Sequence, residues 1–257
     1  MAKPLPRLYN SICFAQSMKT IFKVLTLATL LLIPLKGWGS VPADDENDYI
    51  QVDWYPLLTD SVGWNIASGG LAIGFVDALG SQAPQVAMGR SIELSWINVI
   101  GAKYNNGKGQ RLTIGLGIDW KNYKLSSGHA FLRDEAGVLS VGSFPAGADK
   151  CASRIKVFSL GVPIIFRQRI ARKTDLFLGE VTNFNLHASM HTTYRVGDEK
   201  VDLKSNNLHQ SPVTVDLITG VQYKKVGAYL RYSPFRVIKD GYGPRFSTLA
   251  VGLVLGL

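Results

Sequence analysis

Residues 213–233 read VTVDLITGVQYKKVGAYLRYS, and residues 247–257 read STLAVGLVLGL. Apolar side chains alternate with small or polar ones along both stretches, and the pair Lys224-Lys225 divides the first stretch in two. Alternation with a period of two is typical of β-strands that have one apolar face. The opposite face carries glycines, threonines and the single charges Asp216 and Arg231, which fit a narrow interior better than a water-covered exterior. The pattern therefore predicts three strands of a β-barrel whose apolar face points outward into a membrane.

Five stretches upstream show the same alternation, most clearly residues 111–125, so eight strands are expected in all. Long connections (78–90, 126–151, 193–210 and 234–244) alternate with short ones (105–110, 168–174 and 224–225). Outer-membrane barrels have an even strand number, short periplasmic turns and long external loops. The predicted fold is therefore an all-β, eight-stranded antiparallel transmembrane (up-and-down) β-barrel, with the last strand pairing with the first near Gly70. The predicted strands are residues 63–77, 91–104, 111–125, 152–167, 175–192, 213–223, 226–233 and 248–257.

Aromatic residues cluster near the ends of these strands, where a membrane protein places its interfacial rings. An ordinary soluble β-protein can place aromatic residues in the same way. The alternative fold is a soluble lipocalin-like barrel, which would need charged residues on its outward face. The aromatic residues concerned are Trp96, Tyr104, Trp120, Tyr123, Tyr223, Tyr232, Phe235 and Phe246.

The net charge of +9 gives little support to nucleic-acid binding. Residues 1–43 contain five basic residues and no acidic one, which leaves 23 basic and 19 acidic residues in the remainder. Those basic residues are scattered among the turns. Only 18% of the chain is charged, and its 26 glycines are many for a soluble domain.

The first 43 residues are predicted to be a cleaved signal peptide, because a short basic region precedes the apolar run 21–35 and small residues follow it. Residues 1–17 are interpreted as upstream of the true start at Met18, and cleavage is expected after Gly39 or Ala43. An uncleaved anchor helix is the alternative. Residues 44–60 are predicted to be a periplasmic lead-in, and residues 61–257 the barrel domain.

The chain resembles the small outer-membrane β-barrel family of Gram-negative bacteria, the OmpA/OmpX-like eight-stranded type that includes PorT-like proteins. The resemblance covers residues 61–257 and rests on GLGIDWKNYKL at 115–125, KVFSLGVPIIFR at 156–167, VQYKKVGAYLRYSPF at 221–235 and GYGPRFSTLAVGLVLGL at 241–257. One departure is the final residue, Leu257, where the family usually ends on an aromatic residue. These motifs are architectural, so the resemblance implies a fold and an outer-membrane location rather than an activity.

Five charged residues are predicted to face the lumen: Glu93, Asp119, Lys121, Asp216 and Arg231. If Lys224-Lys225 is a two-residue turn, Tyr223 faces Val226, and Asp216 lies diagonal to Arg231, within reach of its side chain. The interior of an eight-stranded barrel is just wide enough to be filled by side chains. Charges buried there need partners. An ion-pair network that closes the lumen is therefore expected, with a narrow polar conduit as the alternative.

Catalysis has weak support in the sequence. His187 and Ser189 lie two apart on one predicted strand, as a base and a nucleophile would in a lipid A deacylase, but alternation places them with Asn183 and Asn185, toward the lumen. No metal, calcium or phosphate-loop motif is present, and no cofactor is expected.

We expect a non-enzymatic protein of the cell outer membrane with a structural, adhesive or secretion and envelope-assembly role. A narrow porin-like pore and a lipid A-modifying barrel enzyme are the alternatives. The expected partners are outer-membrane lipid and a protein at the long external loops, and no small-molecule ligand can be named.

Overall fold

The computed structural model describes residues 62–257, apart from residues 81–82 and 207. The predicted signal peptide and lead-in lie outside the described residues and stay predictions. Within the described part of the chain, no helix has the length and hydropathy needed to cross a membrane.

Eleven strands and one short 3₁₀ helix, η1 (Met88–Arg90), make up the described part of the chain. The strands are β1 (Gly63–Leu79), β2 (Ile92–Asn105), β3 (Gln110–Lys124), β4 (His129–Arg133), β5 (Leu139–Ser143), β6 (Ala148–Ala171), β7 (Thr174–Val196), β8 (Glu199–Ser205), β9 (Val213–Tyr223), β10 (Val226–Ser233) and β11 (Ser247–Leu255).

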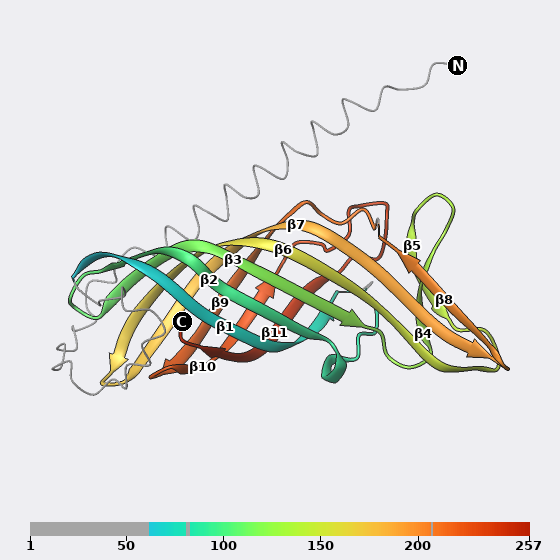
Figure 1. The fold of residues 1–257 in the computed structure, drawn as a ribbon, viewed down its shortest axis with the longest axis horizontal. Helices are drawn as coiled ribbons and strands as arrows, with labels where there is room; N and C mark the ends of the chain where they lie inside the picture. The colour runs from blue at the N-terminus through green and yellow to red at the C-terminus, as the bar shows by residue number, and fades with distance from the viewer. Residues whose placement is uncertain (1–61, 81–82, 207) are drawn as a thin grey trace, which may run out of the picture. The chain divides into compact units, whose positions relative to one another are not determined.

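Eight of the described strands close into an antiparallel ring in the order β1, β2, β3, β6, β7, β9, β10 and β11 (Figure 1). The ring closes where β1 pairs with β11, and the Gly70 amide donates to the carbonyl of Gly256 at 2.7 Å. At the β9–β10 turn Tyr223 pairs with Val226, and Lys224 has a φ of 54°, the left-handed value that such a turn requires. The predicted fold class, the closure near Gly70 and the two-residue turn are confirmed.

The outer surface of the ring is an apolar belt. Along the ring strands, apolar side chains at every second position are exposed on this surface, and the side chains between them are buried inside the barrel. An outward apolar face and a buried polar interior distinguish a membrane-spanning barrel from a soluble one. The belt includes Leu71, Ile73, Phe75, Leu94, Leu116, Ile118, Leu160, Leu178, Leu230, Val251 and Leu253.

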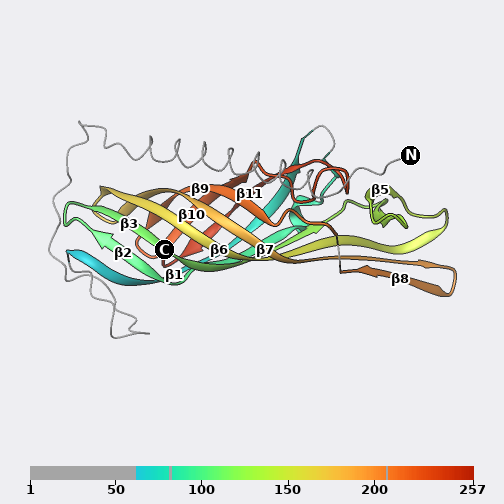
Figure 2. The ribbon, with the colours of Figure 1, turned by 90° about the horizontal axis from the view of Figure 1, so that it is seen from above.

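Strands β6 and β7 extend beyond the predicted bounds: β7 by four residues at the end opposite the short turns, and β6 by four residues at both of its ends, which shortens the predicted 168–174 connection to residues 172–173. Strands β6 and β7 are 24 and 23 residues long. The predicted long loop 126–151 contains the β4–β5 hairpin, and the loop 193–210 contains the end of β7 and β8. Figures 1 and 2 show β4, β5 and β8 gathered at this end of the barrel, opposite the short turns. We call it the external end.

Two apolar clusters lie inside the barrel. The external cluster lies at the external end and includes Tyr123, Phe131, Ile155, Met190, Leu208, Ile238 and Phe246. The inner cluster lies toward the short turns and includes Ala72, Ile97, Ile165, Phe177, Val181, Ile218, Tyr229 and Val254.

The interfacial-ring prediction is correct for some aromatic residues and wrong for others. Of the residues concerned, Tyr104 is exposed at the short-turn end, where its ring centroid lies 5.4 Å from that of Trp64. Tyr123 and Phe246 instead point inward and pack edge-to-face at 5.7 Å in the external cluster. Their neighbours in the ring and loops bury them, so proximity to a strand end did not place them at the membrane surface.

Candidate functional site

The barrel interior between the two apolar clusters holds a network of charged side chains. All five residues predicted to face the lumen are buried there, although they come from four strands: β2, β3, β9 and β10. Three carboxylates and two cations meet, so the ion pairs cross the barrel as well as following neighbouring strands. The members are Glu93, Asp119, Lys121, Asp216 and Arg231.

Arg231 is the centre of this network. Its Nε donates to Oδ2 of Asp216 at 2.7 Å, and its Nη1 donates to Oδ1 of Asp119 at 2.9 Å. Its Nη2 donates to Oδ1 of Asn183 at 3.3 Å, and Nη1 lies 3.9 Å from Oε2 of Glu93. Arg231 is 3% exposed. The planar guanidinium therefore spreads one charge over partners on several strands, which an ammonium group cannot match geometrically.

Lys121 and Asp216 form the second strong pair. The Nζ of Lys121 donates to Oδ2 of Asp216 at 2.7 Å and lies 3.6 Å from Oδ2 of Asp119. The Nδ2 of Asn183 donates to the same Asp216 oxygen at 2.9 Å. One carboxylate oxygen thus receives hydrogen bonds from β3, β7 and β10, so the network links strands on different sides of the barrel.

Glu93 has a different partner from the other carboxylates. Its Oε1 accepts a hydrogen bond of 2.6 Å from the hydroxyl of Tyr229. Space for that hydroxyl comes from Gly74 on β1, where an added Cβ would lie 2.4 Å from the Tyr229 oxygen. The absence of a side chain at Gly74 is therefore a packing requirement of the network.

Sequence reasoning missed Tyr229 and Asn183 as members of the site. Both lie on the predicted lumen face, so alternation had already given their direction. Neither is charged, and the network was chosen by charge alone. Counting uncharged hydrogen-bonding residues on the lumen face would have found them.

The surroundings of the network are apolar. The apolar clusters lie on both sides of it, and no group of three or more His, Cys, Asp or Glu side chains in the described part of the chain could hold a metal ion. Among the buried side-chain nitrogen and oxygen atoms of the five charged residues, Oε2 of Glu93 and Oδ1 of Asp216 lack a hydrogen-bond partner among the described residues. The arrangement can hold strands together and block passage.

The expected direction of His187 and Ser189 is wrong. Phe158 pairs with His187 while Ser159 pairs with Asn185, which leaves Leu186 as the extra residue of a β-bulge. Beyond the bulge the faces of β7 exchange, so His187 is exposed beside the outward Phe158 while Asn185 stays inside. A one-residue shift inverts every later side chain on a strand.

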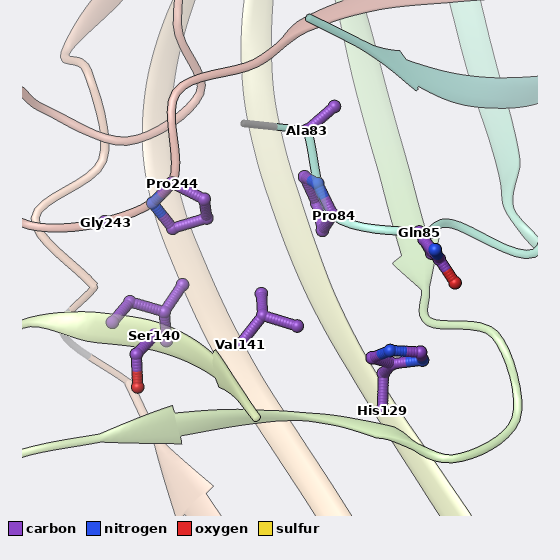
Figure 3. Close-up of a pocket in the computed structure, with 9 residues that line it drawn as sticks. Ala83, Pro84, Gln85, His129, Ser140, Val141, Gly243 and Pro244 are labelled. Atoms are coloured by element: carbon purple, nitrogen blue, oxygen red, sulfur yellow. The ribbon is translucent and has the colours of Figure 1, made fainter. Parts of the chain in front are cut away.

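An open depression of about 440 Å³ lies at the external end, between the β4–β5 hairpin and the neighbouring loops. Figure 3 shows His129 and Val141 of the β4–β5 hairpin opposite Pro84 and Gln85, with Pro244 nearby. Its lining carries no carboxylate, lysine or arginine. This lining is consistent with packing between loops and indicates no particular ligand.

Glu180 is an unexpected carboxylate on the outward face of β7. It pairs with Ile164 of β6 and with Leu217 of β9, while its neighbour Val181 belongs to the inner cluster. Its Oε2 has no hydrogen-bond partner among the described residues. Glu180 is 4% exposed, so its carboxylate lies buried among the outward side chains of β6, β7 and β9, apart from the lumen network.

No protein-family model and no curated protein matches the sequence. Among solved structures, the chain is similar to Neisserial surface protein A (NspA), with 14% identity over 76% of this chain and 97% of that chain, and a TM-score of 0.36. It is also similar to Ail, the attachment invasion locus protein of Yersinia pestis, with 9% identity over 76% of this chain and 99% of that chain, and a TM-score of 0.30. Ail in complex with the heparin analogue sucrose octasulfate gives 11% identity over the same shares and the same TM-score. Likenesses at these TM-scores carry no argument about function, and the strand pairing itself establishes the barrel.

Proposed function

We propose that the protein is a non-enzymatic outer-membrane barrel that presents its external strands and loops to other macromolecules, in a structural or adhesive role, and does not conduct solutes. The observation that carries the proposal is the closed lumen. The Arg231 network lies between two apolar clusters, so a solute would have to displace both buried ion pairs and packed side chains.

The external cluster closes the barrel through loop residues as well as strands. Phe131 of β4 is fully buried, its amide donates to Oγ of Ser153 at 2.9 Å, and its carbonyl accepts from Oγ1 of Thr192 at 3.0 Å. The Oγ of Ser153 on β6 and the Oγ1 of Thr192 on β7 are hydrogen-bonded to each other at 2.7 Å. The β4–β5 hairpin is therefore attached to the barrel wall by buried hydrogen bonds, which favours a fixed closure over a gate.

At the short-turn end, the interior contains a cavity of about 80 Å³ near Asn98 and Arg167. That volume is enough for roughly two or three water molecules at about 30 Å³ each. It supports a dead-ended vestibule rather than a conduit.

The external end supports a surface for partners. Strands β6 and β7 continue past the end of β3, and β8 adds a further strand to this extension. Leu132, Val196 and Leu203 are exposed there, outside the apolar belt. Exposed apolar side chains on a rigid β-scaffold are suited to protein contacts.

Single-channel recording in planar bilayers tests the closed lumen. We expect inserted protein to give no discrete conductance steps, and Arg231→Ala to give none either, because the apolar clusters remain. Stable conductance steps from the unmodified protein would contradict the proposal and favour the porin-like alternative.

The external surface is tested with intact cells that express the protein. Cys151, a free cysteine at the external end of β6, should react with a membrane-impermeant maleimide. The double change Leu132→Ser and Leu203→Ser should reduce retention of those cells on surfaces coated with host matrix proteins, with Leu253→Ser in the belt as the control. Equal retention of all variants would contradict the adhesive role, and labelling only after lysis would reverse the orientation.

A further inference from the structure

A row of basic side chains crosses four neighbouring strands on the outer wall of the barrel, near its external end. Lys124 of β3 pairs with Arg154 of β6, Arg154 pairs with His191 of β7, and His191 pairs with Lys204 of β8. Residues that pair across strands project from the same face of a sheet. Their face is the outward one, since Arg154 is four residues from the outward Phe158.

Lys156 lies between this row and the apolar belt. Its Nζ lies 5.8 Å from the centre of the Trp120 ring, a cation–π distance, and Trp120 pairs with Phe158. Asn122, the strand partner of Lys156, is 9% exposed, and its Oδ1 is buried without a hydrogen-bond partner. A buried amide oxygen without a hydrogen-bond partner among the described residues therefore lies at the strand position next to Lys156.

Lys124, Arg154 and Lys156 have no carboxylate partner among the described residues. Among the described residues, no acidic side chain forms an ion pair with Lys124, Arg154 or Lys156; Arg154 contacts only the His191 ring, at 3.4 Å. Asp202 occupies the other end of the row, where it pairs with His191 at 2.7 Å and with Lys204 at 3.2 Å. The three cations nearest the belt are therefore available to an external anion.

The height of these residues matches the headgroup layer of a membrane. Two residues along a strand advance about 6.6 Å, and barrel strands tilt by roughly 40°, so four residues from Phe158 to Arg154 rise about 10 Å along the membrane normal. The corresponding row of described residues on the opposite wall contains no basic residue. At its external end Asp77 of β1 pairs with Leu249 of β11, and Leu249 pairs with Tyr232 of β10. The basic row is therefore a feature of one side of the barrel rather than of the whole rim.

We propose that Lys124, Arg154, Lys156 and Asn122 form a binding site for the phosphorylated glycolipid of the outer leaflet. Phosphate oxygens accept hydrogen bonds from the two ammonium groups and the guanidinium, and a sugar hydroxyl or amide N–H donates to Oδ1 of Asn122. The acyl chains lie along Trp120 and Phe158 in the belt. This inference rests on the outer-membrane orientation under the proposed function and adds the lipid that the barrel selects.

The test titrates purified, folded full-length protein in zwitterionic detergent micelles with bisphosphorylated lipid A and counts bound lipid by native mass spectrometry. The triple variant Lys124→Gln, Arg154→Gln, Lys156→Gln is compared with Lys150→Gln, Lys200→Gln, Lys239→Gln, which removes three exposed charges elsewhere at the external end. Each cation near an anionic lipid surface contributes roughly a factor of five, so the first variant should bind roughly 100-fold more weakly. The control variant should bind like the unmodified protein.

Further arms identify the ligand. Lipid A without phosphates should bind to the unmodified protein as weakly as intact lipid A binds to the triple variant. Inorganic phosphate should not displace lipid A from the unmodified protein, because inorganic phosphate lacks the acyl chains. Asn122→Leu should lower affinity for lipid A by roughly a factor of five without changing binding of phosphatidylglycerol.

Equal weakening in both triple variants, or equal binding of phosphatidylglycerol and lipid A by the unmodified protein, would overturn the site. Heat-modifiable migration and the absence of conductance are measured on the same variants. If these stay unchanged while lipid A binding shows no dependence on the site, the lipid inference fails and the proposed function stands. If the unmodified protein does not migrate as a folded barrel, the proposed function itself fails.

Discussion

Replacing Arg231 by alanine tests the energetic role of the lumen network directly. The change removes the donors to Asp216, Asp119 and Asn183, and it leaves Lys121 as the single cation of the network for three buried carboxylates. Water cannot readily compensate them, because the external and inner clusters close the lumen on both sides.

The expected loss in the free energy of unfolding is about 3–5 kcal/mol, the usual cost of removing one partner from a buried ion pair. The three lost hydrogen bonds, at roughly 1.5–3 kcal/mol for each one to a charged partner, would add up to a larger loss. Movement of Lys121 toward Asp119, from which it now lies 3.6 Å away, recovers part of this free energy. A loss of this size changes the unfolding equilibrium constant by roughly two to four orders of magnitude.

The assay is reversible unfolding in urea of barrel reconstituted in lipid vesicles, followed by tryptophan fluorescence and by electrophoretic migration without heating. Arg236→Ala is the matched control, because Arg236 also pairs with a carboxylate, Asp240, but is exposed to solvent. An exposed pair contributes about 0–1 kcal/mol. Arg231→Lys should fall between, since it keeps the charge and loses the fork.

A loss below about 1 kcal/mol for Arg231→Ala, equal to that of Arg236→Ala, would refute the reasoning. It would mean that the lumen is wet and that water solvates the carboxylates. Conductance steps appearing in Arg231→Ala would refute a second part, namely that the apolar clusters close the barrel without the ion pairs.

Three further predictions follow from single contacts. Glu180→Leu should raise the free energy of unfolding in vesicles by roughly 1–2 kcal/mol, because a charge on the lipid face is unfavourable; Leu178→Ala is the control, and a loss of stability in Glu180→Leu would contradict the placement of Glu180 in the belt. Gly74→Ala should lower stability by about 1–3 kcal/mol, and by less in a Tyr229→Phe background, because its Cβ would lie 2.4 Å from the Tyr229 oxygen; additive losses would disprove that contact. Burial acts to raise the pKa of Asp202, but hydrogen bonds from Lys204 and His191 outweigh it and hold this pKa below its usual range. A lowered pKa means that ionised Asp202 stabilises the β7–β8 pairing at pH values above about 3.9, the pKa of an aspartate in an unfolded chain. This contribution to stability should be lost as the pH falls below about 3.9 and through the lower pKa of the folded state. An NMR titration midpoint of Asp202 at or above about 3.9 would contradict this expectation.

Sequence alone identified those features that depend on neighbouring residues. The direction of each side chain follows from alternation along a strand, so the outward belt and the inward charges could be derived without a structure. The Asp216–Arg231 contact could be derived too, because the Lys224-Lys225 turn sets the register between the two strands that carry it.

Contacts across the ring depend on tertiary structure. Which carboxylate on β2 or β3 meets Arg231 is decided by strand stagger and barrel diameter, and neither quantity is encoded in any one hairpin. Asn183 reaches the network only because β7 and β9 are neighbours in the closed ring. The bulge at Leu186 reversed the expected direction of His187, since an extra residue is recognised only when the partner strand is in place.

The external closure and the basic row were also beyond reach of the sequence. Phe131 lies in a segment without clear alternation, and its place in the external cluster depends on packing and on the hydrogen bonds of its backbone with Ser153 and Thr192. Lys124, Arg154 and Lys156 look like scattered surface charges along the chain, and pairing of β3 with β6 brings them onto one face. Local periodicity determines which way a side chain points, whereas strand register and ring closure determine which side chains it meets.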